Sequence, residues 1–219
     1  MATFSIRFLG CKVSHADAHA IREALLRDGH AEEGAAEIAI VNTCCVTHEA
    51  VRKSRHAASR AARTHRRVYV TGCGASLAGD GLAGLPENVV VVRRRSEETP
   101  SFVARDVGAI GCVQADARLD RVRAFVRVQD GCSFSCNFCV IPLVRGRSRS
   151  RNAAAVLAEI SKRVRQGHRE VVLSEALLSW LGVGIDGSWG QMIDQARDEL
   201  ARDSIIAWNL GAASAALFG

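Results

Sequence analysis

The sequence predicts an α/β protein whose first part is an open parallel sheet. Two observations carry this prediction: short apolar runs alternate with amphipathic helical segments up to about residue 92, and cysteine recurs just after three of the runs. Strands that alternate with helices of this length are typical of a parallel sheet with helices on its faces. An apolar share of 48% over 219 residues is that of a folded globular protein.

The elements of this first part can be placed in order. The expected strands are Phe4–Leu9, Ile38–Val41, Val68–Val70 and Val89–Val92. The first expected helix, Ala16–Asp28, has Ile21 and Leu25 at helical spacing and stops before Gly29. A second helix, Glu49–Thr64, is rich in alanine and carries a dense row of arginines on its polar side. We assign residues 1–115 to this first domain.

Three cysteines occupy equivalent places in the predicted sheet. Cys11, Cys44 and Cys73 each follow an apolar run by one to three residues. Residues just past the carboxyl ends of parallel strands line the crevice where ligands bind, so the three thiols should converge on one edge. A metal site and three unrelated core cysteines both fit this spacing. Cys45 and Cys112 lack the placement, and we interpret them as small buried residues.

A second set of cysteines lies in one short segment. Gly131–Cys139 reads G-C-S-F-S-C-N-F-C and places Cys132, Cys136 and Cys139 as C-x3-C-x2-C. Three such thiolates can hold three corners of a [4Fe–4S] cluster and leave one iron open. Zinc and a disulfide are the alternatives. Zinc usually takes a fourth Cys or His nearby, whereas no His lies between Cys139 and His168.

The flanks of this segment predict the start of a second domain, residues 118–173. A polar linker, Gly108–Arg121, precedes a strand at Ala124–Val128, and a helix at Ala153–Gln166 and a strand at Glu170–Leu173 follow. Between the cysteines and the helix lies a basic run: Arg145, Arg147, Arg149 and Arg151. Contact with RNA phosphates and a solvated basic loop are equally good interpretations of this run.

The overall composition bears on compartment and partners. Of the 29 basic residues only three are lysines, and the net charge is +6. Arginine suits phosphate contacts, so nucleic acid is a reasonable partner, although coding bias gives the same excess. No apolar run reaches the roughly 20 residues that a membrane span needs, and we recognise no signal peptide. Eight cysteines then suit metal or redox chemistry, and we expect a cytoplasmic protein without a membrane partner.

Both cysteine sets resemble known motifs. C-x3-C-x-aromatic-C, with Phe138 as the aromatic residue, is similar to the signature of the radical S-adenosylmethionine enzymes. The resemblance implies that S-adenosylmethionine binds the open iron, that Phe138 lies beside its adenine, and that an external donor supplies the electron. L-G-C-K at 9–12, N-T-C at 42–44 and T-G-C at 71–73 resemble the N-terminal domain of the tRNA methylthiotransferases.

This second resemblance covers about residues 3 to 173. It implies two [4Fe–4S] clusters, one held by Cys11, Cys44 and Cys73 and the other by Cys132, Cys136 and Cys139. The expected reaction replaces the C2 hydrogen of adenosine 37 in tRNA by a methylthio group. L-G-C-K-V is closer to the branch that acts on threonylcarbamoyladenosine than to the branch that acts on isopentenyladenosine, which is the alternative.

The family pattern ends after Leu173, where Ser174–Leu178 stands in place of the turn that the family would have. We interpret residues 174–219 as a divergent tail, which holds all three tryptophans. A closed strand–helix barrel takes about 200 residues or more, whereas 80 residues follow Cys139. We therefore expect an incomplete radical S-adenosylmethionine (βα) barrel in a truncated relative of the family. A cluster-binding or RNA-binding remnant without catalysis is the second hypothesis, and a zinc protein is the third.

Overall fold

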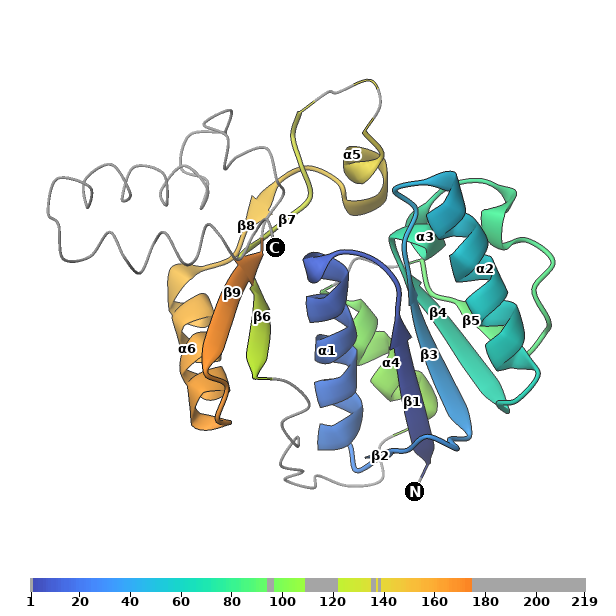
Figure 1. Cartoon of the computed structure of the whole chain (residues 1–219), viewed down its shortest axis with the longest axis horizontal. Coiled ribbons are helices and arrows are strands. Elements are labelled where there is room, and N and C mark those ends of the chain that lie inside the picture. The colour runs from blue at the N-terminus through green and yellow to red at the C-terminus, as the bar shows by residue number, and fades with distance from the viewer. Residues whose placement is uncertain (1, 94–96, 109–121, 135–136, 138, 175–219) are drawn as a thin grey trace, which may run out of the picture. The chain divides into compact units, whose positions relative to one another are not determined.

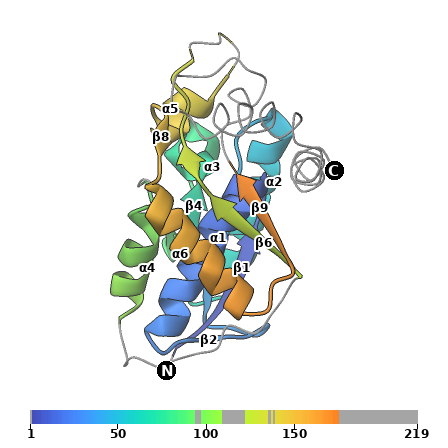
Figure 2. The same ribbon diagram turned by 90° about the vertical axis from the view of Figure 1, so that its left-hand side faces the viewer.

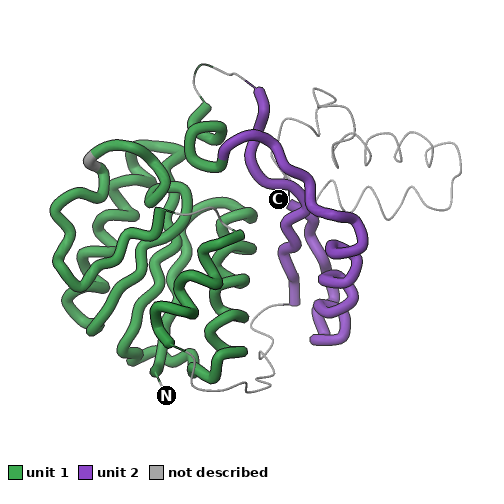
Figure 3. The backbone as a smooth tube through the Cα atoms, turned by 180° about the vertical axis from the view of Figure 1, so that it is seen from behind, with its two compact units in different colours: residues 1–118, 135–145 green, residues 119–134, 146–219 purple. Residues whose placement is uncertain are grey.

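The computed structural model describes residues 2–93, 97–108, 122–134, 137 and 139–174. The chain divides into two compact units, residues 1–118 with 135–145, and residues 119–134 with 146–219 (Figure 3). The predicted boundaries at 115, 118 and 173 stay predictions, and the predicted tail, apart from Ser174, lies outside the described residues.

The first unit is built on a five-stranded sheet in the order β2-β1-β3-β4-β5, and every pair of neighbouring strands is parallel (Figure 1). The strands are β1 (Thr3–Phe8), β2 (Ala31–Glu32), β3 (Ile38–Thr43), β4 (Arg67–Gly72) and β5 (Val89–Val91). The helices are α1 (Lys12–Arg27), α2 (His48–Ala62), α3 (Cys73–Ser76), the 3-10 turn η1 (Asp80–Leu82), α4 (Thr99–Val107) and α5 (Ile141–Arg145). The predicted open parallel α/β sheet is confirmed.

Helices cover the sheet on both faces (Figure 1). On one face α1 and α4 pack against alternate strand residues, and this core contains Phe4, Ile21, Ile40 and Tyr69. On the other face Ala57 and Ala58 of α2 pack over β3 and β4. Because β3 is the central strand and is covered on both faces, all six of its residues are buried.

Several elements differ from the prediction. The first helix begins at Lys12 rather than Ala16, because Cys11 adopts an extended backbone and acts as its N-cap. The strand β3 runs two residues past the apolar stretch, through Asn42 and Thr43. The helix α4 was not predicted at all. It is short, has proline in its first turn, and completes the α1 face of the core.

The second unit contains one strand–helix–strand segment. The parallel strands are β6 (Arg123–Arg127) and β9 (Glu170–Ser174), and α6 (Ala153–Arg165) lies alongside them (Figure 2). A short antiparallel ladder joins β7 (Gln129–Asp130) to β8 (Arg149–Ser150). The predicted strands and helix are confirmed here, and the barrel that they would begin stays a prediction. None of the helices in the described ranges is long and apolar enough to cross a membrane.

Candidate metal centre at the carboxyl edge of the sheet

Three cysteines stand at the carboxyl ends of three neighbouring strands. Cys11 follows β1 and caps α1, Cys44 comes directly after β3, and Cys73 comes directly after β4 and begins α3. Since β1, β3 and β4 are adjacent and parallel, their carboxyl ends lie at one edge of the sheet. The three cysteines therefore lie where the sequence placed them, just past the carboxyl ends of parallel strands.

This edge is also where the order of the strands reverses direction. The chain moves outwards from β1 to β2 and then returns past β1 to β3. In open α/β sheets the crevice for a ligand lies beyond the carboxyl ends of the strands at such a switch point. Cys11 and Cys44 flank this point, and Cys73 is one strand further along.

The loops that carry the cysteines touch one another. A Cβ atom placed on Gly10, the neighbour of Cys11, would lie 3.1 Å from the Cβ atom of Cys44. A Cβ atom placed on Gly74, the neighbour of Cys73, would lie 3.2 Å from the carbonyl oxygen of Cys44. Glycine at these two places lets the outer loops approach the central cysteine from both sides.

Cys44 itself is fixed by α2. The hydroxyl of Ser54 accepts a hydrogen bond from the Cys44 amide at 3.2 Å and donates one to the Cys44 carbonyl at 3.1 Å. Ser54 is buried on α2. The helix begins at an N-cap residue, Thr47, whose side chain accepts a hydrogen bond from the amide of Ala50. The position of the central cysteine is thus tied to that of a whole helix.

The two residues before Cys44 have polar side chains that are buried and hydrogen-bonded. Asn42 and Thr43 are fully buried, and a buried polar group is tolerated only when it is hydrogen-bonded. The amide of Asn42 donates to the carbonyl of Ser14 at 2.6 Å, which ties β3 to the start of α1. The hydroxyl of Thr43 donates to the carbonyl of Thr71 at 2.5 Å and accepts from the amide of Ala75 at 3.2 Å. These bonds hold the ends of β3 and β4 in one arrangement.

Gly72 is required by both its conformation and its surroundings. Its φ is +86° with ψ of −167°, a region that is essentially open only to glycine. A Cβ atom there would lie 2.6 Å from the carbonyl oxygen of Thr43 and 2.9 Å from its amide nitrogen. The T-G-C segment can therefore place Cys73 against β3 only with glycine before the cysteine.

A buried ion pair supports Cys73 in a way that the sequence did not reveal. The guanidinium of Arg145, at the end of α5, donates to the Asp17 carboxylate at 2.7 Å and to the Cys73 sulfur at 3.1 Å. Both members of the ion pair are buried. The thiol of Cys45 forms a hydrogen bond with Cys73. This bond and the positive charge of Arg145 lower the pKa of Cys73. The same bond, together with burial, raises the pKa of Cys45. Arg145 therefore favours the thiolate of Cys73 over that of Cys45, and the thiolate is the form that binds a metal.

Three cysteine thiolates are the kind of ligand set that an iron–sulfur cluster takes. Within the described ranges no three His, Cys, Asp or Glu side chains come together around one metal position. A cubic cluster binds each thiolate through a different iron atom, so its ligands stand further apart. The solvent exposure of the three thiols decreases from Cys11, which is exposed, through half-buried Cys44 to buried Cys73. The site is therefore accessible from the side of Cys11. The cluster itself stays a prediction.

The C-x3-C-x2-C segment is described only in part, because Cys136 and Phe138 lie outside the described residues. Cys132 is buried in the second unit, and its amide donates to the carbonyl of Gly146 at 3.0 Å. Gly131 has a φ of +73°, and a Cβ atom there would lie 2.6 Å from that same carbonyl oxygen. Cys139 is half-buried in the first unit. None of the six cysteines in the described part of the chain forms a disulfide.

The basic run after this segment is largely engaged within the protein. Arg149 lies 3.9 Å from the Asp130 carboxylate, and Arg151 donates to Glu159 at 2.7 Å, while Arg145 pairs with Asp17 as described. Three of the four arginines therefore have carboxylate partners, and both interpretations of the run, contact with RNA phosphates and a solvated basic loop, stay predictions. Arg147 is exposed.

Sequence reasoning missed Asp17, Arg145 and Cys45 as members of this site. Asp17 and Arg145 are 128 residues apart in the chain, and no local pattern links them. Cys45 is buried as predicted, but its contact with Cys73 was not expected. Its position next to Cys44, just past the end of β3 and beside the neighbouring strand that Cys73 follows, is the one signal that could have indicated it.

The first unit matches a known protein family. Residues 3–93 match the family UPF0004, an uncharacterized protein family. This match covers β1 to β5 and all three cysteines at the carboxyl edge.

The chain is also similar to several methylthiotransferases. It is 35% identical over 182 residues to the threonylcarbamoyladenosine tRNA methylthiotransferase MtaB of Chlamydia pneumoniae, with 78% of this chain and 42% of the relative aligned. MtaB of Bacillus subtilis is 32% identical over 80% of this chain and 43% of the relative. The ribosomal protein uS12 methylthiotransferase RimO of Thermus thermophilus is 34% identical over 87% of this chain and 47% of the relative.

The chain thus spans less than half the length of the curated relatives it matches. The alignment with RimO takes in a larger share of the chain than residues 1–173 make up. The matched N-terminal domain and these similarities lead to one conclusion: the chain carries the UPF0004 domain and is homologous to the methylthiotransferases MtaB and RimO over most of its own length.

Proposed function

We propose that this chain acts in methylthio transfer and carries the cysteines for two [4Fe–4S] clusters. One observation carries the proposal: Cys11, Cys44 and Cys73 follow three adjacent parallel strands, on loops that touch one another. In this proposal they hold one cluster, and Cys132, Cys136 and Cys139 hold the other together with S-adenosylmethionine. When bound, these groups supply the electron-transfer, radical and sulfur chemistry of the reaction.

The protein's own residues prepare the first of these sites. Arg145 holds a positive charge 3.1 Å from the Cys73 sulfur and so favours its thiolate, while Asp17 keeps the guanidinium in place. Asn42 and Thr43 lock the ends of the strands through bonds to Ser14, Thr71 and Ala75. The edge is therefore organised before any ligand binds, which lowers the conformational cost of binding.

The proposed substrate is tRNA, with N6-threonylcarbamoyladenosine 37 as the modified nucleotide. The L-G-C-K segment and the 35% identity to the tRNA enzyme MtaB support this choice. Ribosomal protein uS12 is the second candidate, because RimO is 34% identical over a larger share of the chain. Mass spectrometry of tRNA and of uS12 after incubation with the full chain and S-adenosylmethionine separates the two.

The cluster sites can be tested without catalysis. After anaerobic reconstitution with iron and sulfide, the chain should bind up to two clusters, or about eight iron atoms. Cys44→Ala should remove about four of them, whereas Cys45→Ser, which replaces the neighbouring thiol but keeps a hydrogen-bond donor for Cys73, should retain most of the iron. Cys136→Ala should remove the other four. Iron content near zero, or equal losses in the Cys44 and Cys45 variants, would contradict the proposed ligand set, and zinc as the bound metal would favour the structural alternative.

Catalysis needs a separate measurement. Cluster-loaded protein mixed with dithionite and S-adenosylmethionine should release 5′-deoxyadenosine above the background of the Cys136→Ala variant. A fully loaded chain that releases none would support the cluster-binding or RNA-binding remnant instead.

A further inference from the structure

A basic pocket lies on the α2 face of the first unit, apart from the cysteines. It has a volume of about 380 Å³ and is lined by residues of β1, the segment after it, and α2: Arg7, Leu9, Arg52, Lys53, His56, Ala57 and Arg60. All of them belong to the same compact unit. We call this feature the α2 pocket.

The pocket exists because α2 covers only part of its face of the sheet. The helix packs over β3 and β4 through Ala57 and Ala58. On β1, Phe4 and Ile6 pack into the opposite core, so strand alternation directs Arg7 towards the α2 side. The core contacts of α2 on that side are mainly with β3 and β4. The space beside α2 is therefore bordered by the exposed Arg7 side chain instead of an apolar residue.

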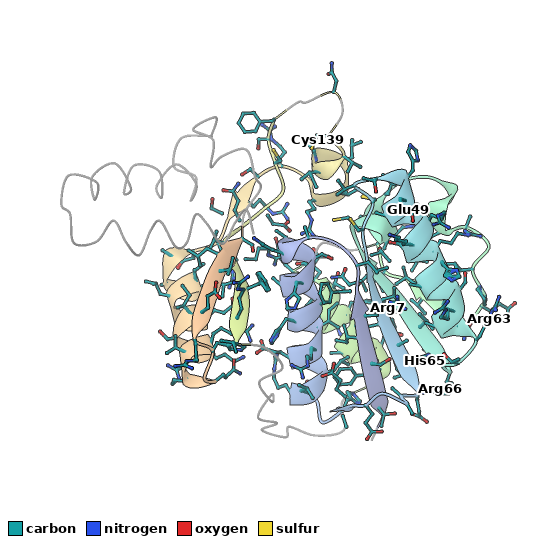
Figure 4. The ribbon with its side chains drawn as sticks, viewed as in Figure 1. Arg7, Glu49, Arg63, His65, Arg66 and Cys139 are labelled. Atoms are coloured by element: carbon teal, nitrogen blue, oxygen red, sulfur yellow. The ribbon has the colours of Figure 1, made fainter. Side chains whose placement is uncertain are left out.

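The charge around the pocket is strongly one-sided. Its lining holds three arginines and one lysine, and no acidic residue. The carboxylate of Glu49 pairs with Arg52 at 2.7 Å and with Lys53 at 3.6 Å near the start of α2. Arg7 and Arg60 form no ion pair with a carboxylate in the described part of the chain. Figure 4 shows Glu49 and Arg63 towards opposite ends of α2, so the acidic residue lies near one end only.

The chemistry of the lining selects a class of ligand. Arginine guanidinium groups suit the oxygen atoms of phosphates, and a volume of about 380 Å³ accommodates a phosphate with its sugar. Apart from the His56 ring the lining offers no aromatic surface, so base stacking, which gives base-binding sites their affinity, is largely missing. Contacts with phosphates position a nucleic acid without reading its sequence.

The pocket also lies close to the metal centre along the chain. Leu9, in its lining, is two residues before Cys11, and the Leu9 amide donates to the carbonyl of Asn42, two residues before Cys44. A polymer whose backbone binds here would pass near the carboxyl edge of the sheet.

We propose that the α2 pocket binds the phosphate backbone of the RNA substrate, with Arg7 and Arg60 as the principal contacts. The choice of RNA rests on the function proposed above, whereas the anion site rests on the pocket itself. The site orients the RNA and leaves recognition of the modified nucleotide to other residues.

The test measures binding of a 17-nucleotide RNA hairpin to the reconstituted full chain by fluorescence anisotropy between 50 and 200 mM KCl. Each phosphate contact contributes about 0.8 to the slope of log affinity against log salt, which corresponds to about sixfold in affinity at 0.1 M. Arg7→Gln with Arg60→Gln should therefore weaken binding about 40-fold at 0.1 M and lower the slope by about 1.6.

A matched control removes the same charge from the opposite face. Arg27 in α1 and Arg105 in α4 are both exposed, and Arg27→Gln with Arg105→Gln should change the affinity less than about threefold, because distant charges are screened at this ionic strength. Equal losses in the two double variants, or no binding of the hairpin by the parent chain, would overturn the proposal. Equally tight binding of an acidic peptide, lost with Arg7 and Arg60, would also overturn it and indicate a protein partner.

The result for RNA binding can be distinguished from the result for the proposed metal centre. The double variant at Arg7 and Arg60 should keep the iron content and the circular dichroism spectrum of the parent chain, since both side chains are exposed. The Cys44→Ala variant should lose iron and still bind the hairpin. Loss of RNA binding with an intact cluster, or the reverse, therefore tells which of the two proposals has failed.

Discussion

Replacement of Gly72 by alanine tests whether the edge of the sheet is as tightly packed as the structure shows. The backbone conformation at Gly72, with φ of +86° and ψ of −167°, costs a residue with a side chain about 1–3 kcal/mol. The new methyl group would also lie 2.6 Å from the Thr43 carbonyl oxygen, and overpacking of this kind costs about 1–3 kcal/mol more. The sum, about 2–6 kcal/mol, is a large part of the roughly 5–15 kcal/mol that holds a typical domain together.

Two further glycines separate the two contributions. Gly108 has nearly the same φ, +91°, and a Cβ atom placed there would have nothing within 4 Å, so Gly108→Ala carries the conformational cost alone. Gly34 has open space and no positive φ, so Gly34→Ala should be neutral or slightly stabilising. We expect destabilisation to decrease from Gly72→Ala through Gly108→Ala to Gly34→Ala.

Hydrogen exchange followed by mass spectrometry provides the assay. Amides in peptides from β3 and β4 exchange through global opening of the unit, so their exchange rates report its free energy of unfolding. The Gly72→Ala variant should also bind less iron after reconstitution, because Cys73 follows the replaced residue directly. If Gly72→Ala destabilises these peptides no more than Gly108→Ala does, the close contact with Thr43 is refuted.

Three other predictions concern buried and capping groups. Arg145→Met should lower the free energy of unfolding by about 3–5 kcal/mol in urea denaturation, because it leaves the Asp17 carboxylate buried without its partner; adding Asp17→Leu should recover much of the loss, and no recovery would argue against the ion pair. Burial and the hydrogen bond to Asp106 raise the pKa of Tyr69 to about 12, so its contribution is fully present below about pH 10 and is lost as the pH rises towards 12. Wild type should lose up to about 3 kcal/mol more than Tyr69→Phe over that range, and parallel pH profiles of unfolding would contradict this. Asn152→Ala should destabilise α6 by about 1 kcal/mol, because the Asn152 side chain accepts hydrogen bonds from the amides of the first turn; amide exchange in that turn measures the loss, and Asn152→Asp should largely preserve the cap.

The sequence predicted the parts of the fold that local patterns control. The apolar runs at Ile38 and Val68 became the central parallel strands because β-branched residues fill positions buried on both faces. The same runs put Cys44 and Cys73 just past strand ends, so the common edge on which these cysteines lie could be deduced from the sequence alone.

Local sequence patterns do not predict buried polar residues whose bonding partners are distant in the chain. Asn42 and Thr43 look like the end of a strand because they are polar, yet both are fully buried within β3. Their side chains bond to Ser14, Thr71 and Ala75, none of which is a neighbour in sequence. The pairing of Arg145 with Asp17 is hidden for the same reason, since each residue alone resembles an ordinary surface charge.

The graded exposure of Cys11, Cys44 and Cys73 has a consequence for how the centre would be built and attacked. A carrier that delivers iron and sulfide from solution meets Cys11 first, whereas Cys73 is reached last. Assembly should therefore proceed inwards from the start of α1, and alkylating agents or oxidants should modify Cys11 before the thiols beneath it. In the proposed centre, Cys11 would therefore be both the first ligand that a carrier reaches and the thiol most open to modification.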